Sequence, residues 1–313
     1  MTTVRGVPLV TGATGFAGSH LLDRLLLAHE RVAGWVHSDP ESSDGTPRVG
    51  WQQVDILDRA AVRRAIQEIQ PSVIYHCAGL PHVAESWTNS GRALEVNALG
   101  THHLLDAVRE SSPHSRVIVA GSALVYRPSD TALREDSPLG PGDPYGLSKL
   151  AQEMLAVRAD TMVIATRPFN HIGPRQKASF STASFAKQIA EIEAGQRDPV
   201  MLVGNLDSRR DLTDVRDTVR AYEALAAHGI PGRIYNICSG QAHRMGDVLD
   251  RLIALARVPV SVEQDPARMR PSDNPVVLGD PSRIAADTGW KAEIPIEQTL
   301  EDLLAWWRTQ VTS

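Results

Sequence analysis

The sequence has few cysteines, little net charge and no long apolar run. Only two of its 313 residues are cysteines, and both Cys77 and Cys238 stand in apolar, strand-like runs, which predicts buried thiols in a reducing compartment. The net charge of -5 gives no reason to expect nucleic acid or an anionic membrane as a partner. No apolar run approaches the roughly 18 residues of a membrane span. Residues 1–12 lead almost at once into an apparent strand, so we expect no secretory signal and a cytoplasmic location.

Internal repeats, low-complexity segments and Gly/Ser linkers are also absent from the sequence. The composition is that of an ordinary globular protein, with 42% hydrophobic and 22% charged residues. Short apolar runs alternate with amphipathic helical stretches. Strands are predicted at 7–10, 32–36, 72–77, 116–121, 162–167 and 233–238. This alternation predicts an α/β fold with a Rossmann-type, doubly wound parallel sheet.

The glycines of TGATGFAGSH follow the first predicted strand and precede a leucine-rich helix. Their spacing lets the backbone turn sharply and approach a pyrophosphate, whose charge then meets the amide end of the helix. The segment therefore predicts a dinucleotide site that includes Gly12, Thr14, Gly15, Phe16, Ala17 and Gly18.

After residue 170 the alternation becomes less regular, although helices are still predicted at 184–195, 245–256 and 298–310. We interpret the chain as two closely joined parts. The dinucleotide-binding domain takes residues 1–170, with 204–238 partly rejoining it, and residues 171–203 and 239–313 form a smaller C-terminal α/β lobe that binds the substrate.

The end of the second predicted strand bears on the choice of cofactor. A carboxylate there binds the ribose hydroxyls of NAD and repels the phosphate of NADP. His37 and Ser38 come first and Asp39 comes a step late, which favours NADP(H) and leaves NAD(H) as the alternative. Asp55, after a third short strand, is placed to contact the adenine. The alternative for Asp55 is a helix N-cap.

The YGLSK segment places Tyr145 and Lys149 four residues apart, on one face of a helix. A free tyrosine has a pKa near 10, and we expect the lysine ammonium to lower that pKa so that Tyr145 can act as an acid at neutral pH. Ser122 ends the strand at 116–121, where its hydroxyl can bond the same substrate oxygen. The three residues are typical of hydride transfer coupled to protonation of one oxygen.

Together with HCAG (76–79) and NALGT (97–101), these motifs resemble the extended short-chain dehydrogenases that act on nucleotide sugars. The segments 167–176, 204–217 and 270–280 resemble the GDP-4-keto-6-deoxy-D-mannose reductases, which make GDP-D-rhamnose, and the related GDP-mannose 4,6-dehydratases. The resemblance implies cofactor contacts at Ile56, Ala78, Gly79, Asn97, Pro168, Asn170 and His171. It also implies substrate contacts at His82, Ser122, Asn170, Lys187, Arg210 and Arg270, with the arginines binding the diphosphate of a GDP- or dTDP-linked sugar.

The residues beside Ser122 separate the two activities. The dehydratases carry an acidic residue just after the strand-end Ser or Thr, whereas this chain has Ala123 and Leu124. Neither can move a proton, so we predict reduction of a C4 ketone without elimination of water. Glu85 or Glu135 would have to enter the pocket to restore dehydration. Reduction of a dTDP-linked sugar, 4-epimerisation and non-catalytic dinucleotide sensing are the alternatives.

Three further expectations complete the prediction. Arg127 replaces a glycine that is common in the family and is expected to alter the mouth of the sugar pocket. His102 and His103 have no third ligand at useful spacing, so no metal site is predicted. The segment 101–110 and the helix of Tyr145 have apolar faces that imply a homodimer, as in the family.

Overall fold

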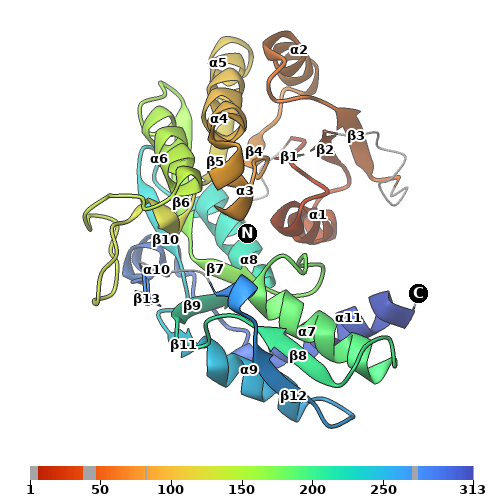
Figure 1. The fold of residues 1–313 in the computed structure, drawn as a ribbon. Helices are drawn as coiled ribbons and strands as arrows, with labels where there is room; N and C mark the ends of the chain where they lie inside the picture. The colour runs from red at the N-terminus through yellow and green to blue at the C-terminus, as the bar shows by residue number, and fades with distance from the viewer. Residues whose placement is uncertain (1–5, 38–46, 82, 270–273, 313) are drawn as a thin grey trace.

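The computed structural model describes residues 6–37, 47–81, 83–269 and 274–312 (Figure 1). Three of the predicted site residues, Ser38, His82 and Arg270, lie outside the described residues. No helix in the described part of the chain has the length and apolar character needed to cross a bilayer.

A parallel sheet of seven strands forms the larger part of the molecule, in the order β10-β6-β5-β4-β1-β2-β3. The strands are β1 (Leu9–Thr11), β2 (Val32–Val36), β3 (Val49–Gln53), β4 (Val73–His76), β5 (Arg116–Ala120), β6 (Met162–Pro168) and β10 (Ile234–Ile237). All six pairings between neighbours are parallel. The predicted Rossmann-type fold is confirmed. Because the strand order reverses between β1 and β4, a ligand crevice is expected at the carboxyl ends of these two strands.

Helices cover both faces of this sheet. Helices α1 (Phe16–Ala28) and α8 (Val215–His228) pack on one face, and α2 (Arg59–Ile69), α5 (Gly100–Ser111) and α6 (Pro144–Ala156) pack on the other. The leucines of α1 show why the sequence folds this way, since Leu21, Leu22 and Leu25 recur at helical spacing and are all buried. Full burial of each such side chain stabilises the fold by about 1.5–3 kcal/mol.

Short helical segments follow the carboxyl ends of β4 and β5 and pack against α6. They are α3 (Val83–Thr88), α4 (Ser90–Leu94), the π-helix η2 (Glu95–Leu99) and the 3₁₀ turn η3 (Ala123–Val125). The π-helix runs directly into α5, so the chain from residue 90 to residue 111 is helical with one wide turn. Wide turns of this kind occur most often at functional sites.

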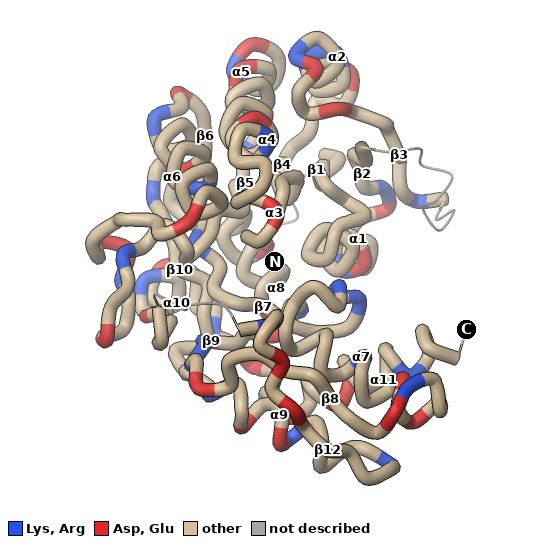
Figure 2. The backbone as a smooth tube through the Cα atoms, viewed as in Figure 1, with Lys and Arg blue, Asp and Glu red and all other residues tan. Residues whose placement is uncertain are grey.

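The smaller part is built around β9 (Arg209–Asp214), which pairs with β7 (Asn170–Ile172), β11 (Ala242–Arg244) and β13 (Val276–Val277). A separate pair joins β8 (Val200–Val203) to β12 (Ser261–Gln264). Its own core lies between α7 (Ser181–Glu193), α9 (Met245–Ala254) and α11 (Ile296–Thr312), with the turn η4 (Pro266–Arg268) at its edge. Helix α10 (Ser282–Thr288) packs instead against α8 and β10 of the larger part. Acidic and basic residues alternate over the surfaces of both parts (Figure 2).

Candidate active site

The glycine turn between β1 and α1 is shaped for close approach of a ligand. Gly12 has φ +65°, and a Cβ atom there would lie 2.8 Å from the Cα atom of Ala78; a Cβ atom at Gly18 would overlap the Gly12 carbonyl. Helix α1 begins at Phe16 without a side-chain cap and without an acidic residue in its first turn. Its N–H groups and positive dipole end therefore suit the pyrophosphate of a dinucleotide.

Two aspartates near the end of β3 have different roles. Asp58 is the N-cap of α2, because its side chain accepts hydrogen bonds from Ala60 N and Ala61 N at 3.0 and 2.9 Å. Asp55 therefore does not cap the helix. It is exposed, and within the described residues its side chain bonds the Leu57 amide in its own turn, at 2.9 Å, so its carboxylate stays available near the end of β3.

The loop after β4 is held from behind by Asn97. Its Oδ1 atom accepts from Leu80 N at 2.9 Å, and its Nδ2 atom donates to Leu80 O at 3.3 Å and to Ser148 Oγ at 2.9 Å. The side chain is fully buried. Asn97 therefore positions the loop that carries Ala78 and Gly79, and its direct contact with the cofactor stays a prediction.

A small aromatic stack connects the glycine turn to the start of the second part. The rings of Phe16 and His171 lie 5.5 Å apart at an angle of 8°, and His20 meets Phe16 edge-on at 5.7 Å. Burial lowers the pKa of His20 to about 4 and also lowers the pKa of His171, so both rings are neutral at pH 7. Pro168 is buried in β6, whereas Asn170 is exposed at the start of β7.

Ser122, Tyr145 and Lys149 come together at the carboxyl ends of β4 and β5. Ser122 caps η3 by accepting from Leu124 N at 3.1 Å, and it is also hydrogen bonded to Tyr145. Lys149 is 6% exposed and donates to Ala120 O at 2.8 Å and to Gln152 Oε1 at 2.9 Å. Its Nζ atom lies beside Gly79, within 3.4 Å of where a Cβ atom would stand.

The ionisation of Tyr145 differs from the prediction. Burial raises the pKa of Tyr145 to about 12, the hydrogen bond with Ser122 opposes that rise, and Lys149 has no resolved part in it. Burial also lowers the pKa of Lys149 to about 8, since its hydrogen-bond acceptors are neutral. The protein without ligands therefore does not show the expected lowering of the tyrosine pKa by the lysine, which stays a prediction for the complex with cofactor and substrate.

The predicted substrate residues of the second part are more dispersed. Arg210 of β9 donates to the carbonyls of Arg209 and Pro275 at 2.8 and 3.3 Å. The neighbouring Asp211 is fully buried and binds the amides of Ser239, Gly240 and Gly279, which fixes the strand that carries Arg210.

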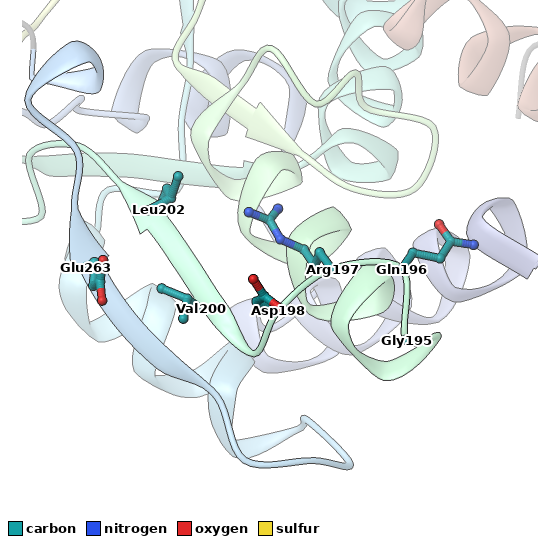
Figure 3. Close-up of a pocket in the computed structure, with 7 residues that line it drawn as sticks. All are labelled: Gly195, Gln196, Arg197, Asp198, Val200, Leu202 and Glu263. Atoms are coloured by element: carbon teal, nitrogen blue, oxygen red, sulfur yellow. The ribbon is translucent and has the colours of Figure 1, made fainter.

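Lys187 lies in a different setting from the arginine. It forms an ion pair with Glu191 at 3.4 Å and lies 5.8 Å from the ring centre of Trp307, so its ammonium is directed along α7 toward α11. A surface pocket of about 660 Å³ opens near the end of the same helix (Figure 3). It is lined by Gly195, Gln196, Arg197, Asp198, Val200, Leu202 and Glu263, a set that includes none of the predicted site residues.

Comparison with known proteins places the chain. A family model described as GDP-mannose 4,6 dehydratase matches residues 9–303. The chain belongs to this family. It is 36% identical to the GDP-6-deoxy-D-mannose reductase of Pseudomonas aeruginosa over 96% of this chain and 97% of the relative. It is 27% identical to the GDP-mannose 4,6-dehydratase of Yersinia enterocolitica, over 95% of this chain and 92% of that relative.

Solved structures agree with the family. The structure of RMD from Pseudomonas aeruginosa complexed with NADPH superposes with a TM-score of 0.84 at 32% identity, covering 98% of this chain and all of that one. MoeE5 in complex with UDP-glucuronic acid and NAD gives 0.85 at 28% identity, covering 97% of this chain and 100% of that one. The predicted family of extended short-chain dehydrogenases and the predicted class of NAD(P)-dependent enzyme are confirmed.

Proposed function

We propose that this family member reduces the C4 ketone of GDP-4-keto-6-deoxy-D-mannose to give GDP-D-rhamnose, with NADPH as the preferred reductant. The proposal is supported by the 36% identity to a GDP-6-deoxy-D-mannose reductase and by the NADPH bound to the RMD structure. It is carried by one observation on this chain: Ser122, Tyr145 and Lys149 converge, and the two residues that follow Ser122, Ala123 and Leu124, supply no carboxylate.

The residues of the site divide the proton transfer between them. When bound, NADPH supplies the hydride that reaches C4. The Ser122 hydroxyl orients the ketone oxygen, and the Tyr145 hydroxyl gives that oxygen its proton. Because the pKa of Tyr145 is raised to about 12, the phenol is fully protonated at neutral pH. The Lys149 ammonium, close to the same site, stabilises the phenolate that the transfer leaves.

Elimination of water needs a second proton-moving group, and the structure accounts for each candidate. Ala123 and Leu124 occupy the 3₁₀ turn after Ser122. Glu135 accepts from the Asn236 amide at 2.9 Å and pairs with Arg283 at 3.3 Å, and its side chain is 4% exposed. Glu85 is exposed in the first turn of α3. The Glu135 carboxylate is thus engaged by other partners, which supports reduction alone.

The test follows the absorbance of NADPH. The purified protein is mixed with NADPH and GDP-4-keto-6-deoxymannose, and in a parallel sample with the dTDP-linked counterpart. Rapid loss of absorbance with the GDP-linked sugar supports the proposal, whereas faster loss with the dTDP-linked sugar would replace the nucleotide. An epimerase or a non-catalytic sensor would cause no net consumption of NADPH.

A second sample tests the missing carboxylate. GDP-mannose is offered with NADP, and the products are read by mass spectrometry. We expect GDP-mannose to be recovered unchanged, because one group must remove the C5 proton while another protonates the departing C6 hydroxyl. Loss of one water from GDP-mannose would show a dehydratase.

We also infer a homodimer, on a surface that differs in part from the predicted one. The apolar residues of α5, such as Leu104 and Leu105, are buried under α2 and the sheet. Large apolar side chains are instead exposed on the neighbouring helices: Trp87, Leu94, Leu99, Leu147, Met154 and Leu155. Figure 1 shows α4 and α6 side by side at the same edge of the molecule. A second copy would cover this apolar surface.

The dimer is checked by light scattering at micromolar concentration. The wild type is expected to give twice the chain mass, and Leu147→Glu combined with Met154→Glu is expected to give a monomer. A wild-type monomer would remove the inference without affecting the proposed reaction.

A further inference from the structure

The buried side of Lys149 carries a chain of polar side chains that the reaction described above does not use. Lys149 Nζ donates to Gln152 Oε1 at 2.9 Å, and Gln152 Nε2 donates to Thr101 Oγ1 at 2.8 Å. Thr101 Oγ1 lies 2.8 Å from His76 Nε2, and His76 Nδ1 lies 2.8 Å from Thr11 Oγ1. Each of these four partners is at most 1% exposed. The chain therefore runs, without water, from the lysine to the residue before Gly12.

The donors and acceptors in this chain have only one consistent arrangement. The Thr101 hydroxyl donates to Asn97 O at 2.7 Å, so it can only accept from His76 and Gln152. His76 then carries its proton on Nε2 and accepts at Nδ1 from the Thr11 hydroxyl. Thr11 Oγ1 in turn accepts from Ala78 N at 3.1 Å. Each bond in the chain then has one donor and one acceptor, and the imidazole is neutral, in agreement with a pKa of about 3 that results from burial and from the charge of Lys149.

This arrangement fixes which end of Gln152 faces the lysine. Because its NH₂ group is bound to Thr101, its carbonyl oxygen must point at Lys149 Nζ. A carbonyl dipole stabilises an ammonium without neutralising it, so the lysine keeps its charge for the reacting oxygen. Two of its three N–H groups are used, by Ala120 and Gln152, and their directions aim the third.

We propose that Gln152 is a positioning residue for Lys149. Thr101, His76 and Thr11 connect Gln152 to the dinucleotide turn, so that the lysine and the glycine turn are held in a fixed position relative to each other. The proposal deepens the proposed reduction and rests on it for the role of the lysine. It concerns the placement and protonation of Lys149, which can be measured with or without turnover.

The other titratable groups around Lys149 leave Gln152 as the adjustable partner. Tyr145 shares the helix, and Cys77 and His76 face the lysine from the end of β4. Glu153, also on α6, is bound to Arg167 of β6. The remaining charged groups on the elements packed against α6 are exposed or paired with one another: Glu85 on α3, Arg92 and Glu95 on α4 and η2, and His102, Asp106 and Arg109 on α5, while His103 bonds Ile56 O.

The test uses two substitutions with opposite expected signs. Gln152→Leu removes the acceptor and should lower the pKa of Lys149, with a change in its proton dissociation constant of about tenfold or more, the usual effect of one hydrogen bond to a charged group. Gln152→Glu places a carboxylate there and should raise that pKa. NMR titration of ¹³C-labelled lysine in the enzyme without cofactor reads the pKa directly. The alkaline limb of kcat/KM for NADPH-dependent reduction should move in the same two directions.

A matched pair at Thr101 covers the case in which a Gln152 variant fails to fold. Thr101→Ser keeps the hydroxyl and should retain the wild-type Lys149 pKa, whereas Thr101→Val removes the anchor of the Gln152 amide and should lower that pKa. Displacement in the same direction by both Gln152 variants, or an unchanged lysine pKa in Gln152→Leu and Thr101→Val, would overturn the proposal. Absence of reductase activity in the wild type would overturn the proposed function instead, and the Lys149 pKa measured by NMR would still test the role of Gln152.

Discussion

Helix α6 carries the buried cation Lys149 and, one turn later, the carboxylate of Glu153, which binds the buried cation Arg167 of β6. The two cations are treated in opposite ways. Toward the crevice, Lys149 is bound by two neutral acceptors, Ala120 O and Gln152 Oε1, and its pKa falls to about 8. Toward β6, Glu153 binds Arg167 through two hydrogen bonds of 2.7 Å, and the pKa of Arg167 is raised. The sequence separation between Lys149 and Glu153 is only one helical turn.

The difference teaches how one helix serves both chemistry and stability. The Glu153 carboxylate neutralises Arg167, so the charge of Arg167 cannot stabilise a substrate. The ion pair joins α6 to β6 of the sheet. The Lys149 charge is desolvated but not neutralised. It therefore costs folding free energy and remains able to stabilise a phenolate in the crevice.

The largest effect is expected on turnover, at the Tyr145–Lys149 site in the crevice. Tyr145→Phe removes the proton donor and should lower kcat for NADPH-dependent reduction by at least about 100-fold, the contribution of one general acid. Cofactor affinity, measured by quenching of tryptophan fluorescence, should change little, and so should the urea midpoint. Near-normal turnover in this variant would remove Tyr145 from the mechanism.

One turn further along α6, at Glu153, a substitution should change stability and not turnover. Glu153→Gln leaves the Arg167 charge buried with its carboxylate gone, and the expected loss in the free energy of unfolding is about 3–5 kcal/mol. Urea denaturation measures it, and kcat per folded molecule should stay close to that of the wild type. The control is the double variant Glu153→Gln with Arg167→Met, which removes the unpaired charge and should recover part of the loss. A large fall in kcat with unchanged stability would contradict this division of roles.

Burial of Lys149 should change how the free energy of unfolding depends on pH. Because the folded pKa of Lys149 is about 8 and its ordinary value is 10.5, the unfolded chain binds more protons between these two pH values. Stability of the wild type should therefore rise with pH across this window, relative to Lys149→Met, by about 3 kcal/mol. Urea titrations of both proteins at about pH 8 and about pH 10 give the difference. Parallel curves would mean that the lysine is not desolvated.

The Tyr145–Lys149 site and the Glu153–Arg167 ion pair were not equally predictable from the sequence. Tyr145 and Lys149 were found because their spacing is local, and the glycine turn was found because it lies between a strand and a helix. Glu153–Arg167 joins residues 14 apart whose partnership depends on how α6 packs on β6. Gln152 was missed for the same reason, since only the fold brings it to Thr101, 51 residues away.

Burial explains the errors of the prediction as well. The lysine was expected to lower the pKa of Tyr145, but desolvation exceeds every local charge in the protein without ligands. The contact of Asn97 with the Leu80 backbone was not predicted, because it depends on the wide turn of η2. The strands around β9 were overlooked because several are only two or three residues long, which is too short for an alternating pattern to be recognised.

The smallest effect is expected at Tyr126, whose ring lies 4.6 Å from the Arg167 guanidinium and whose hydroxyl donates to Asn236 Oδ1 at 2.7 Å. Tyr126→Phe deletes one hydroxyl, as Tyr145→Phe does, but beside the ion pair of Glu153 and Arg167. The Phe ring keeps the contact with the guanidinium, so the cost is one hydrogen bond, about 1 kcal/mol in urea denaturation. Turnover should equal that of the wild type, because the Tyr126 hydroxyl donates its hydrogen bond to Asn236 Oδ1 and not to a ligand. A fall in kcat comparable to that of Tyr145→Phe would show that the Lys149 site and the Glu153–Arg167 site are coupled, and the contrast drawn between Lys149 and Arg167 would then be wrong.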